Sequence, residues 1–102
     1  MSQKPNYYVE HAPQADLDMI GIFDYIHSKS RDLLTALGVT RRIEKKIEIL
    51  EHNPHVSELF GKDTYRLIEY PYLIFYTINE ETKTVSVVHI RHGAEQEFLP
   101  RS

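Results

Sequence analysis

The stretch Tyr72-Leu-Ile-Phe-Tyr-Thr-Ile78 decides the fold, because it is almost continuously apolar and rich in β-prone residues. A run of this kind is typical of the strand at the centre of a sheet. Two further β-prone stretches flank it, residues 64–70 before Pro71 and residues 84–91 after the polar turn at 79–83. Short connections join antiparallel neighbours, so the second half of the chain is predicted to form a three-stranded meander.

Upstream of this sheet, a short β-prone run at residues 7–9 is followed by a helical period that begins near Pro13. Residues 27–30 break the pattern, so Ser30 is expected to cap a second helix and Asn53-Pro54 to end it. The two predicted helical stripes are Ala15, Met19, Ile22, Phe23 and Ile26, then Leu33, Ala36, Leu37, Thr40, Ile43, Ile47 and Leu50. The sequence therefore predicts an α+β fold, β-α-α-β-β-β, with a helical hairpin on one face of a small, mainly antiparallel sheet. The other face has no covering element and is a candidate working surface.

Composition restricts the class of protein. The chain has 102 residues, 41% of them hydrophobic and 26% charged, which predicts one domain over residues 1–102. Without cysteine, disulfide scaffolds, cysteine zinc sites and thiol catalysis are excluded. The net charge of −3 argues against a protein that grips nucleic acid non-specifically. No stretch approaches the ~18 apolar residues of a membrane span and no signal peptide is present, so no membrane partner and a cytoplasmic location are expected.

Six histidines raise the question of a metal site, with H-x-x-H spacings at His52/His55 and His89/His92. A three-residue offset along a strand places side chains on opposite faces, so His89 and His92 are not expected to share a metal. His52 and His55 lack a third or fourth ligand at zinc-like spacing. We therefore expect no metal and no cofactor.

The strands carry a cationic and imidazole set: Lys62, Arg66, His89, Arg91 and His92. Cleaving RNA through its own 2′-hydroxyl requires a base, an acid and a cation at the phosphate, and His and Arg suit these roles. The alternative is that Arg66 and Arg91 pair with local acids on a solvated face. Residue types alone favour the alternative.

The second helix has a basic outer edge that could bind a partner: Arg41, Arg42, Lys45, Lys46 and, among these charges, the apolar Ile49. The alternative is a solvated face whose charges pair along the helix.

Taken in order, three groups of residues resemble a known family. They are Ala15-Asp16-Leu17-Asp18 at the start of the first helix, Tyr65-Arg66-Leu67 in the meander, and a last strand that ends in His92-Gly93-Ala94. The chain resembles the RelE/ParE superfamily of toxins from bacterial type II toxin–antitoxin systems, from about residue 7 to residue 94. The resemblance implies a cytoplasmic toxin, associated with plasmid stabilisation, that is neutralised by a cognate antitoxin in a hetero-oligomeric complex.

The same resemblance implies three possible functions. ParE-like members bind and poison DNA gyrase without chemistry of their own, and the helical hairpin and the His92-Gly93-Ala94 ending favour this function. RelE-like members cut mRNA in the ribosomal A site, for which Arg66, Arg91, His92 and Lys62 would be the catalytic candidates. A degenerate member would bind only the antitoxin, and Glu95 departs from the arginine usual in ParE-like chains at that position. The candidates for target binding are Arg66, Arg91 and His92.

Overall fold

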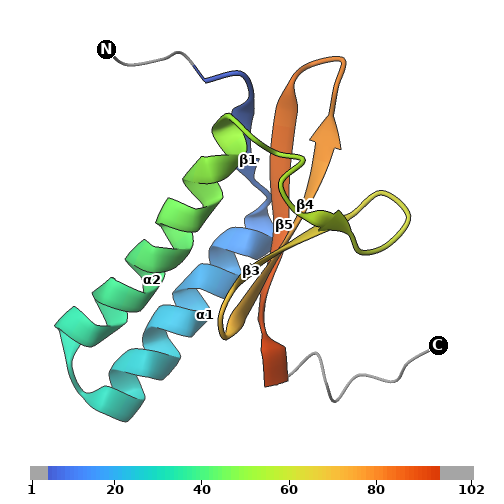
Figure 1. The fold of residues 1–102 in the computed structure, drawn as a ribbon. Helices are drawn as coiled ribbons and strands as arrows, with labels where there is room; N and C mark the ends of the chain where they lie inside the picture. Colours follow the sequence, from blue (N-terminus) through green and yellow to red (C-terminus); the bar gives the residue numbers. More distant parts are fainter. Residues whose placement is uncertain (1–4, 95–102) are drawn as a thin grey trace.

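Two helices lie against one face of a five-stranded mixed sheet in the computed structural model, which describes residues 5–94 (Figure 1). The elements are β1 (Tyr8–His11), α1 (Pro13–Ser30), α2 (Leu33–Glu48), the 3-10 turn η1 (Ile49–Glu51), β2 (Glu58–Leu59), β3 (Tyr65–Glu69), β4 (Tyr72–Asn79) and β5 (Thr84–His92). The α+β fold and the position of the helical hairpin are thus confirmed. The structure adds the short strand β2, which the sequence did not indicate.

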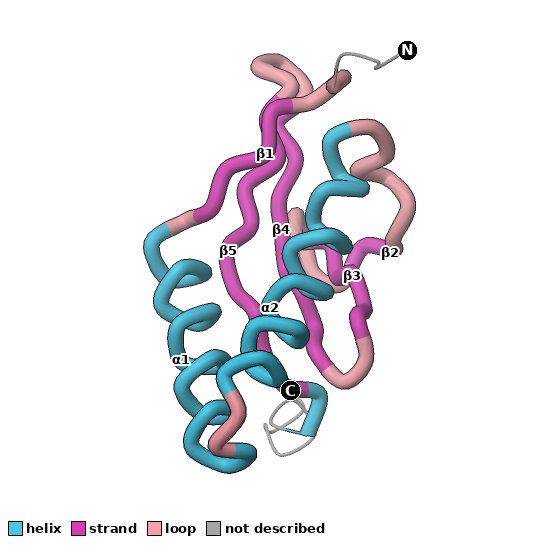
Figure 2. The backbone as a smooth tube through the Cα atoms, turned by 90° about the vertical axis from the view of Figure 1, so that its left-hand side faces the viewer, coloured by secondary structure: helices cyan, strands magenta, loops and turns pink. Residues whose placement is uncertain are grey.

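The sheet has the strand order β1-β5-β4-β3-β2, and within it only β1 and β5 are parallel. As the apolar run predicts, β4 lies at the centre. Figure 2 shows both helices on the same side of the sheet, with β1 leading directly into α1. None of the helices in residues 5–94 has the length and apolar character needed to cross a membrane.

The core lies between the hairpin and the sheet. On the sheet side, Leu67, Ile74 and Ile90 form one buried cross-strand row, because they are partners in the pairing of β3, β4 and β5. On the helix side, the predicted stripe of α2 is buried at Ala36, Thr40, Ile43 and Ile47, whereas its members Leu33 and Leu37 are exposed. The first turn of α2 therefore contributes no leucine to the core.

The junction of the two helices differs from the prediction. Helix α1 continues to Ser30, whose hydroxyl donates to the carbonyl of Ile26 at 2.8 Å, so this serine ends α1 instead of capping α2. Arg31 then adopts a left-handed backbone with φ 57°, and Asp32 is the true N-cap. Its carboxylate accepts from Thr35 Oγ1 at 2.7 Å and from the Leu34 N–H at 3.1 Å, and these bonds lower the pKa of Asp32.

A β-bulge interrupts the pairing of β4 with β5. Phe75 is opposite His89, but the next residue, Tyr76, is opposite Val87, so Val88 is an extra residue in β5. Because side chains alternate along a strand, the extra residue exchanges the two faces beyond it. Ile90 thereby joins Val85 and Val87 in the core.

Candidate functional site

The side of the sheet away from the helices carries two of the predicted site residues. This surface, which we call the open face, consists of two neighbouring cross-strand rows, Arg66–Phe75–His89 and Ile68–Leu73–Arg91. Each of these residues neighbours a buried residue of the helix-facing row in its own strand, which places it on the opposite side. The structure therefore brings Arg66 and Arg91 onto one face.

Arg66 is held by residues of β2 and the segment that follows it. Its Nη2 donates to Glu58 Oε1 at 3.2 Å, and its guanidinium carbon lies 4.8 Å from the centre of the Phe60 ring. Phe60 in turn packs against Phe75, with ring centres 5.2 Å apart. Arg66 Nε is buried and has no hydrogen-bond partner within residues 5–94. Arg66 thus sits between an acid and an aromatic ring, and neither Glu58 nor Phe60 stood out in the sequence.

Arg91 is also paired with an acid. Its Nη1 donates to Asp18 Oδ1 at 3.1 Å, and its Nη2 lies 3.3 Å from His89 Nδ1. The other oxygen of Asp18 accepts from the backbone N–H of Ile90 at 2.9 Å. The Asp18 side chain is only 7% exposed, whereas that of Arg91 is 37% exposed. The pairing of both arginines with local acids agrees with the alternative that residue types favoured.

His92 is not on the open face with the two arginines, although it lines a hollow to which Asp18 and Arg91 also contribute. It lies on the helix side of the sheet, where its ring meets Tyr72 edge-on at 5.5 Å and its Nδ1 accepts from the Ala94 N–H at 3.0 Å. His92 lines a hollow of about 550 Å³ whose other walls include Leu17, Gly21 and Tyr25 of α1. His89 and His92 are thus on opposite faces, as their spacing predicts.

The other predicted residues are distributed over the surface. Lys62 is exposed in the loop between β2 and β3, and Glu95 lies outside the described residues. Among the candidates for a partner surface, Arg41, Arg42, Lys45 and Ile49 are exposed and Lys46 is half-buried. Arg42 Nε lies 3.4 Å from Glu69 Oε2 and so connects α2 with β3. Within residues 5–94, no group of three or more His, Asp or Glu side chains is placed to hold a metal ion.

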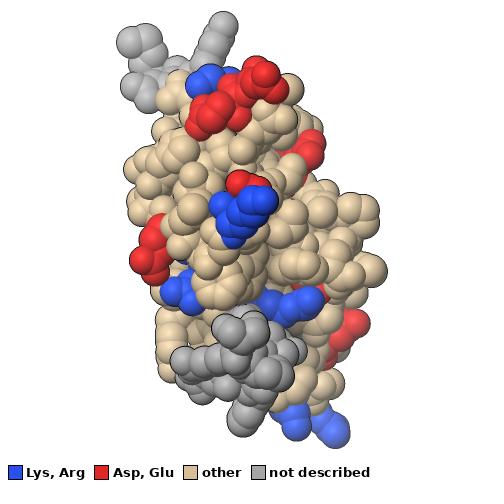
Figure 3. Space-filling view, turned by 90° about the vertical axis from the view of Figure 1, so that its right-hand side faces the viewer, with Lys and Arg blue, Asp and Glu red and all other residues tan. Residues whose placement is uncertain are grey.

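The charges on the open-face side of the molecule, away from the helices, are dispersed. Figure 3 looks onto it and shows Lys and Arg as separate spots on a mostly uncharged surface, some of them touching Asp or Glu. Exposed apolar side chains lie among them, with Phe60 46% and Ile68 51% exposed. As far as residues 5–94 show, the open face therefore offers apolar contact area with paired charges, and not a continuous basic patch.

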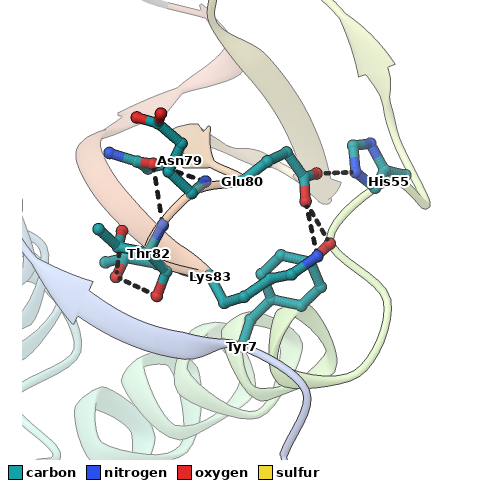
Figure 4. A network of polar contacts seen from close by, with 8 residues as sticks. Tyr7, His55, Asn79, Glu80, Thr82 and Lys83 are labelled. Atoms are coloured by element: carbon teal, nitrogen blue, oxygen red, sulfur yellow. Dashed lines mark hydrogen bonds and ion pairs between the residues drawn. The ribbon is translucent and has the colours of Figure 1, made fainter.

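A cluster around Glu80 lies at the turn between β4 and β5 (Figure 4). The Glu80 carboxylate accepts from Tyr7 Oη at 2.9 Å and Lys83 Nζ at 3.1 Å, and it lies 2.7 Å from His55 Nε2. The bond with His55, followed by those with Lys83 and Tyr7, lowers the pKa of Glu80 to about 2. These contacts connect three segments that are distant in sequence, so we assign the cluster a structural role.

Comparison with known proteins agrees with this fold. A family model described as the ParE toxin of the type II toxin–antitoxin system parDE matches residues 9–97. No curated protein is similar enough to count as a match.

Among solved structures, the chain is similar to the chromosomal ParDE system from P. aeruginosa, with 14% identity and a TM-score of 0.72 over 85% of this chain and 96% of that one. It is similar to the RelBE2 toxin–antitoxin complex from Mycobacterium tuberculosis, with 20% identity and a TM-score of 0.62 over 86% and 98% of the two chains. The archaeal RelE–RelB complex from Pyrococcus horikoshii OT3 gives 18% identity and a TM-score of 0.60 over 86% and 96%. At these identities the structural likeness shows the fold.

Proposed function

Because the chain belongs to the ParE toxin family of type II toxin–antitoxin systems, we propose that it poisons DNA gyrase by binding it, without chemistry of its own. The observation that carries this proposal is the character of the open face. Its centre is apolar and aromatic, and its arginines Arg66 and Arg91 are each paired with a carboxylate.

Such a surface suits a protein target better than an RNA backbone. Protein interfaces have a core depleted in charge and enriched in aromatic residues and arginine, which matches Phe60 and Phe75 around Arg66. A ribonuclease face has to attract a polyanion, and most of that attraction comes from lysine and arginine that are available to phosphates. The net charge of −3 works against that attraction. We therefore favour gyrase binding over mRNA cleavage as the function of this face.

The second partner in the proposal is the cognate antitoxin, in a hetero-oligomeric complex. The outer side of the hairpin offers it Leu34, which is 75% exposed, and Ile49, which is 42% exposed and follows the basic residues of α2. A partner segment that folds on binding can bury such side chains. Both proposed partners would place the toxin in the cytoplasm, and stabilisation of a plasmid is a role that the pair could serve.

Two reactions in parallel test the proposal. The purified protein is added to a supercoiling reaction with gyrase and closed circular plasmid, and separately to a translating extract with a defined mRNA. Linear plasmid after denaturation of gyrase, together with intact mRNA, supports the proposal. Cuts in the mRNA at the ribosomal A site would contradict it and support the endonuclease. An effect in neither reaction would contradict it too and would indicate a member that binds only antitoxin.

A pair of matched variants tests the open face itself. Ile68→Lys places a charge at an exposed position of the open face on β3, and Leu34→Lys makes the same change at an exposed leucine near the start of α2. We expect the first variant to lose gyrase poisoning and the second to keep it, with both melting near the wild-type temperature. If Leu34→Lys lost the activity and Ile68→Lys kept it, the open face would not be the target-binding surface.

A further inference from the structure

Asp18 occupies the point where β5 loses its strand neighbour. The parallel pairing with β1 ends at His11 and Val87, and the next residue, Ala12, donates its N–H to the Val87 carbonyl at 2.8 Å. The chain then turns into α1, which continues alongside β5 (Figure 2). Beyond Val87, the Asp18 carboxylate takes over the role of a strand partner by accepting the N–H of Ile90. The position of Asp18 is therefore set by the backbone of the sheet.

The second oxygen of Asp18 determines where the Arg91 guanidinium lies. Arg91 belongs to the open-face row with Ile68 and Leu73, yet its Nη1 reaches Asp18 on α1 and its Nη2 lies against His89 Nδ1. Arginine binds a phosphate through two parallel N–H groups. In this arrangement each terminal nitrogen already has a partner, Asp18 of α1 for Nη1 and His89 of the open face for Nη2, so the guanidinium is directed along the edge of β5 towards α1.

Burial makes this pairing hard to exchange for a phosphate. Asp18 is 7% exposed, so losing Arg91 would leave a nearly buried carboxylate without its cation. Another basic side chain, His89, has its Nδ1 3.7 Å from Asp18 Oδ2, but it carries a positive charge only when it is protonated. The acid that pairs with Arg66 differs, because Glu58 is 76% exposed and water can replace its partner. Of the two arginines, Arg91 is therefore the one whose pairing with an acid is harder to exchange for a phosphate contact.

We propose that Asp18 is a specificity-determining residue, which prevents the open face from binding RNA by holding Arg91 at the edge of β5. This proposal rests on the proposed function, because it assigns to Asp18 the difference between an open face that binds gyrase and one that binds RNA. Asp18 acts through Arg91 and is in that sense a positioning residue.

The test measures binding of a short fluorescein-labelled single-stranded RNA of mixed sequence by anisotropy, across a range of salt concentrations. Asp18→Asn retains an oxygen for the Ile90 N–H but loses the charge that holds Arg91. Asp16→Asn is the matched control, because Asp16 lies on the same helix, its side chain is 63% exposed, and its Oδ1 lies 3.4 Å from His11 Nδ1 and not near an arginine of the open face. One additional phosphate contact predicts binding about fivefold tighter at 0.1 M salt and a log–log salt slope steeper by about 0.7 for Asp18→Asn. The control changes the net charge equally and should leave the slope as in the wild type.

Arg91→Gln keeps the proposal testable if Asp18→Asn folds poorly. Arg91→Gln retains an amide donor for Asp18, and in the otherwise unchanged protein it should weaken RNA binding no more than Arg41→Gln at the exposed edge of α2. The double variant Asp18→Asn/Arg91→Gln should return to the slope of the wild type. Equal slopes for Asp18→Asn and Asp16→Asn would overturn the proposal, as would a loss of RNA binding specific to Arg91→Gln. Since no gyrase is present, a failure here is distinct from a failure of gyrase poisoning.

Discussion

Tyr76→Phe is expected to destabilise the protein far more than the loss of one oxygen suggests. Tyr76 is fully buried at the centre of the sheet, and its hydroxyl donates to the Pro54 carbonyl at 2.7 Å and hydrogen-bonds with Ser57. These bonds anchor the segment between η1 and β2, and that segment leads to Glu58 and Phe60 beside Arg66. Burial raises the pKa of the Tyr76 hydroxyl, so it remains a neutral donor over the ordinary pH range.

The size of the destabilisation follows from the hydrogen-bond acceptor that the phenylalanine leaves without a donor. The Pro54 carbonyl would remain buried without its donor, and an unsatisfied buried acceptor costs about 1–3 kcal/mol. Taking about 2 kcal/mol, and roughly 4–8 °C per kcal/mol for a domain near 100 residues, the melting temperature should fall by roughly 8–16 °C. The loss should be concentrated in the anchored segment, so the Phe60 N–H, which bonds to the Thr64 carbonyl at 2.7 Å, should exchange its hydrogen faster.

Urea unfolding followed by circular dichroism measures the free energy, and native-state hydrogen exchange measures the local effect. Tyr65→Phe is the control, because Tyr65 stacks on Tyr76 with ring centres 5.4 Å apart but has no hydroxyl hydrogen bond within the described residues. Equal stabilities of the two variants would show that the Tyr76 hydroxyl contributes nothing to stability, and the reasoning above would then be refuted.

Three further changes test other parts of the structure. Glu80→Gln should lower the melting temperature at neutral pH, because the ionised Glu80 stabilises the fold and glutamine cannot replace its charge. The difference in melting temperature between the variant and the wild type should shrink as the pH falls from 4.5, the ordinary pKa of glutamate, towards about 2, the lowered pKa of Glu80. A difference that stays constant in melts across this range would contradict the assignment. Ile43→Ala should cost about 2–5 kcal/mol in urea unfolding and Ile43→Val about 0.5–1.5 kcal/mol, since Ile43 is fully buried, and similar losses would mean that its environment collapses around the cavity. Asp32→Ala should lower the melting temperature more than Asp24→Ala at an exposed position of α1, because only Asp32 caps a helix; melts of equal midpoint would count against the cap.

The main elements could be predicted because each carries its own period in the sequence. The expected strands at 64–70, 72–78 and 84–91 correspond to β3, β4 and β5 within two residues at each end. Strand β2 escaped prediction because its residues, Glu58 and Leu59, are both exposed and form a strand only by pairing with β3. The end of α1 was misplaced because serine near a helix end can bond back to its own helix as well as cap the next one.

The site was harder to predict than the fold, because contacts across elements decide it. The residue types of Arg66 and Arg91 indicated that they would pair with acids, but nothing in the spacing identified Asp18 and Glu58 as those acids. Asp18 lies 73 residues before Arg91, and its helical position suggested only a favourable place in the first turns of α1.

The single bulge in β5 decides which polar side chains can act together. With strict alternation, Arg91 would share a face with Val85 and Val87, and so would be directed into the core, while His92 would lie on the same side of the sheet as Arg66. The extra residue Val88 reverses this order, so that Ile90 fills the core, Arg91 reaches the edge and His92 faces the hollow beside α1. A strand that ends in Ile-Arg-His can therefore present the guanidinium or the imidazole on either face, and the bulge determines that the guanidinium lies where Asp18 can hold it.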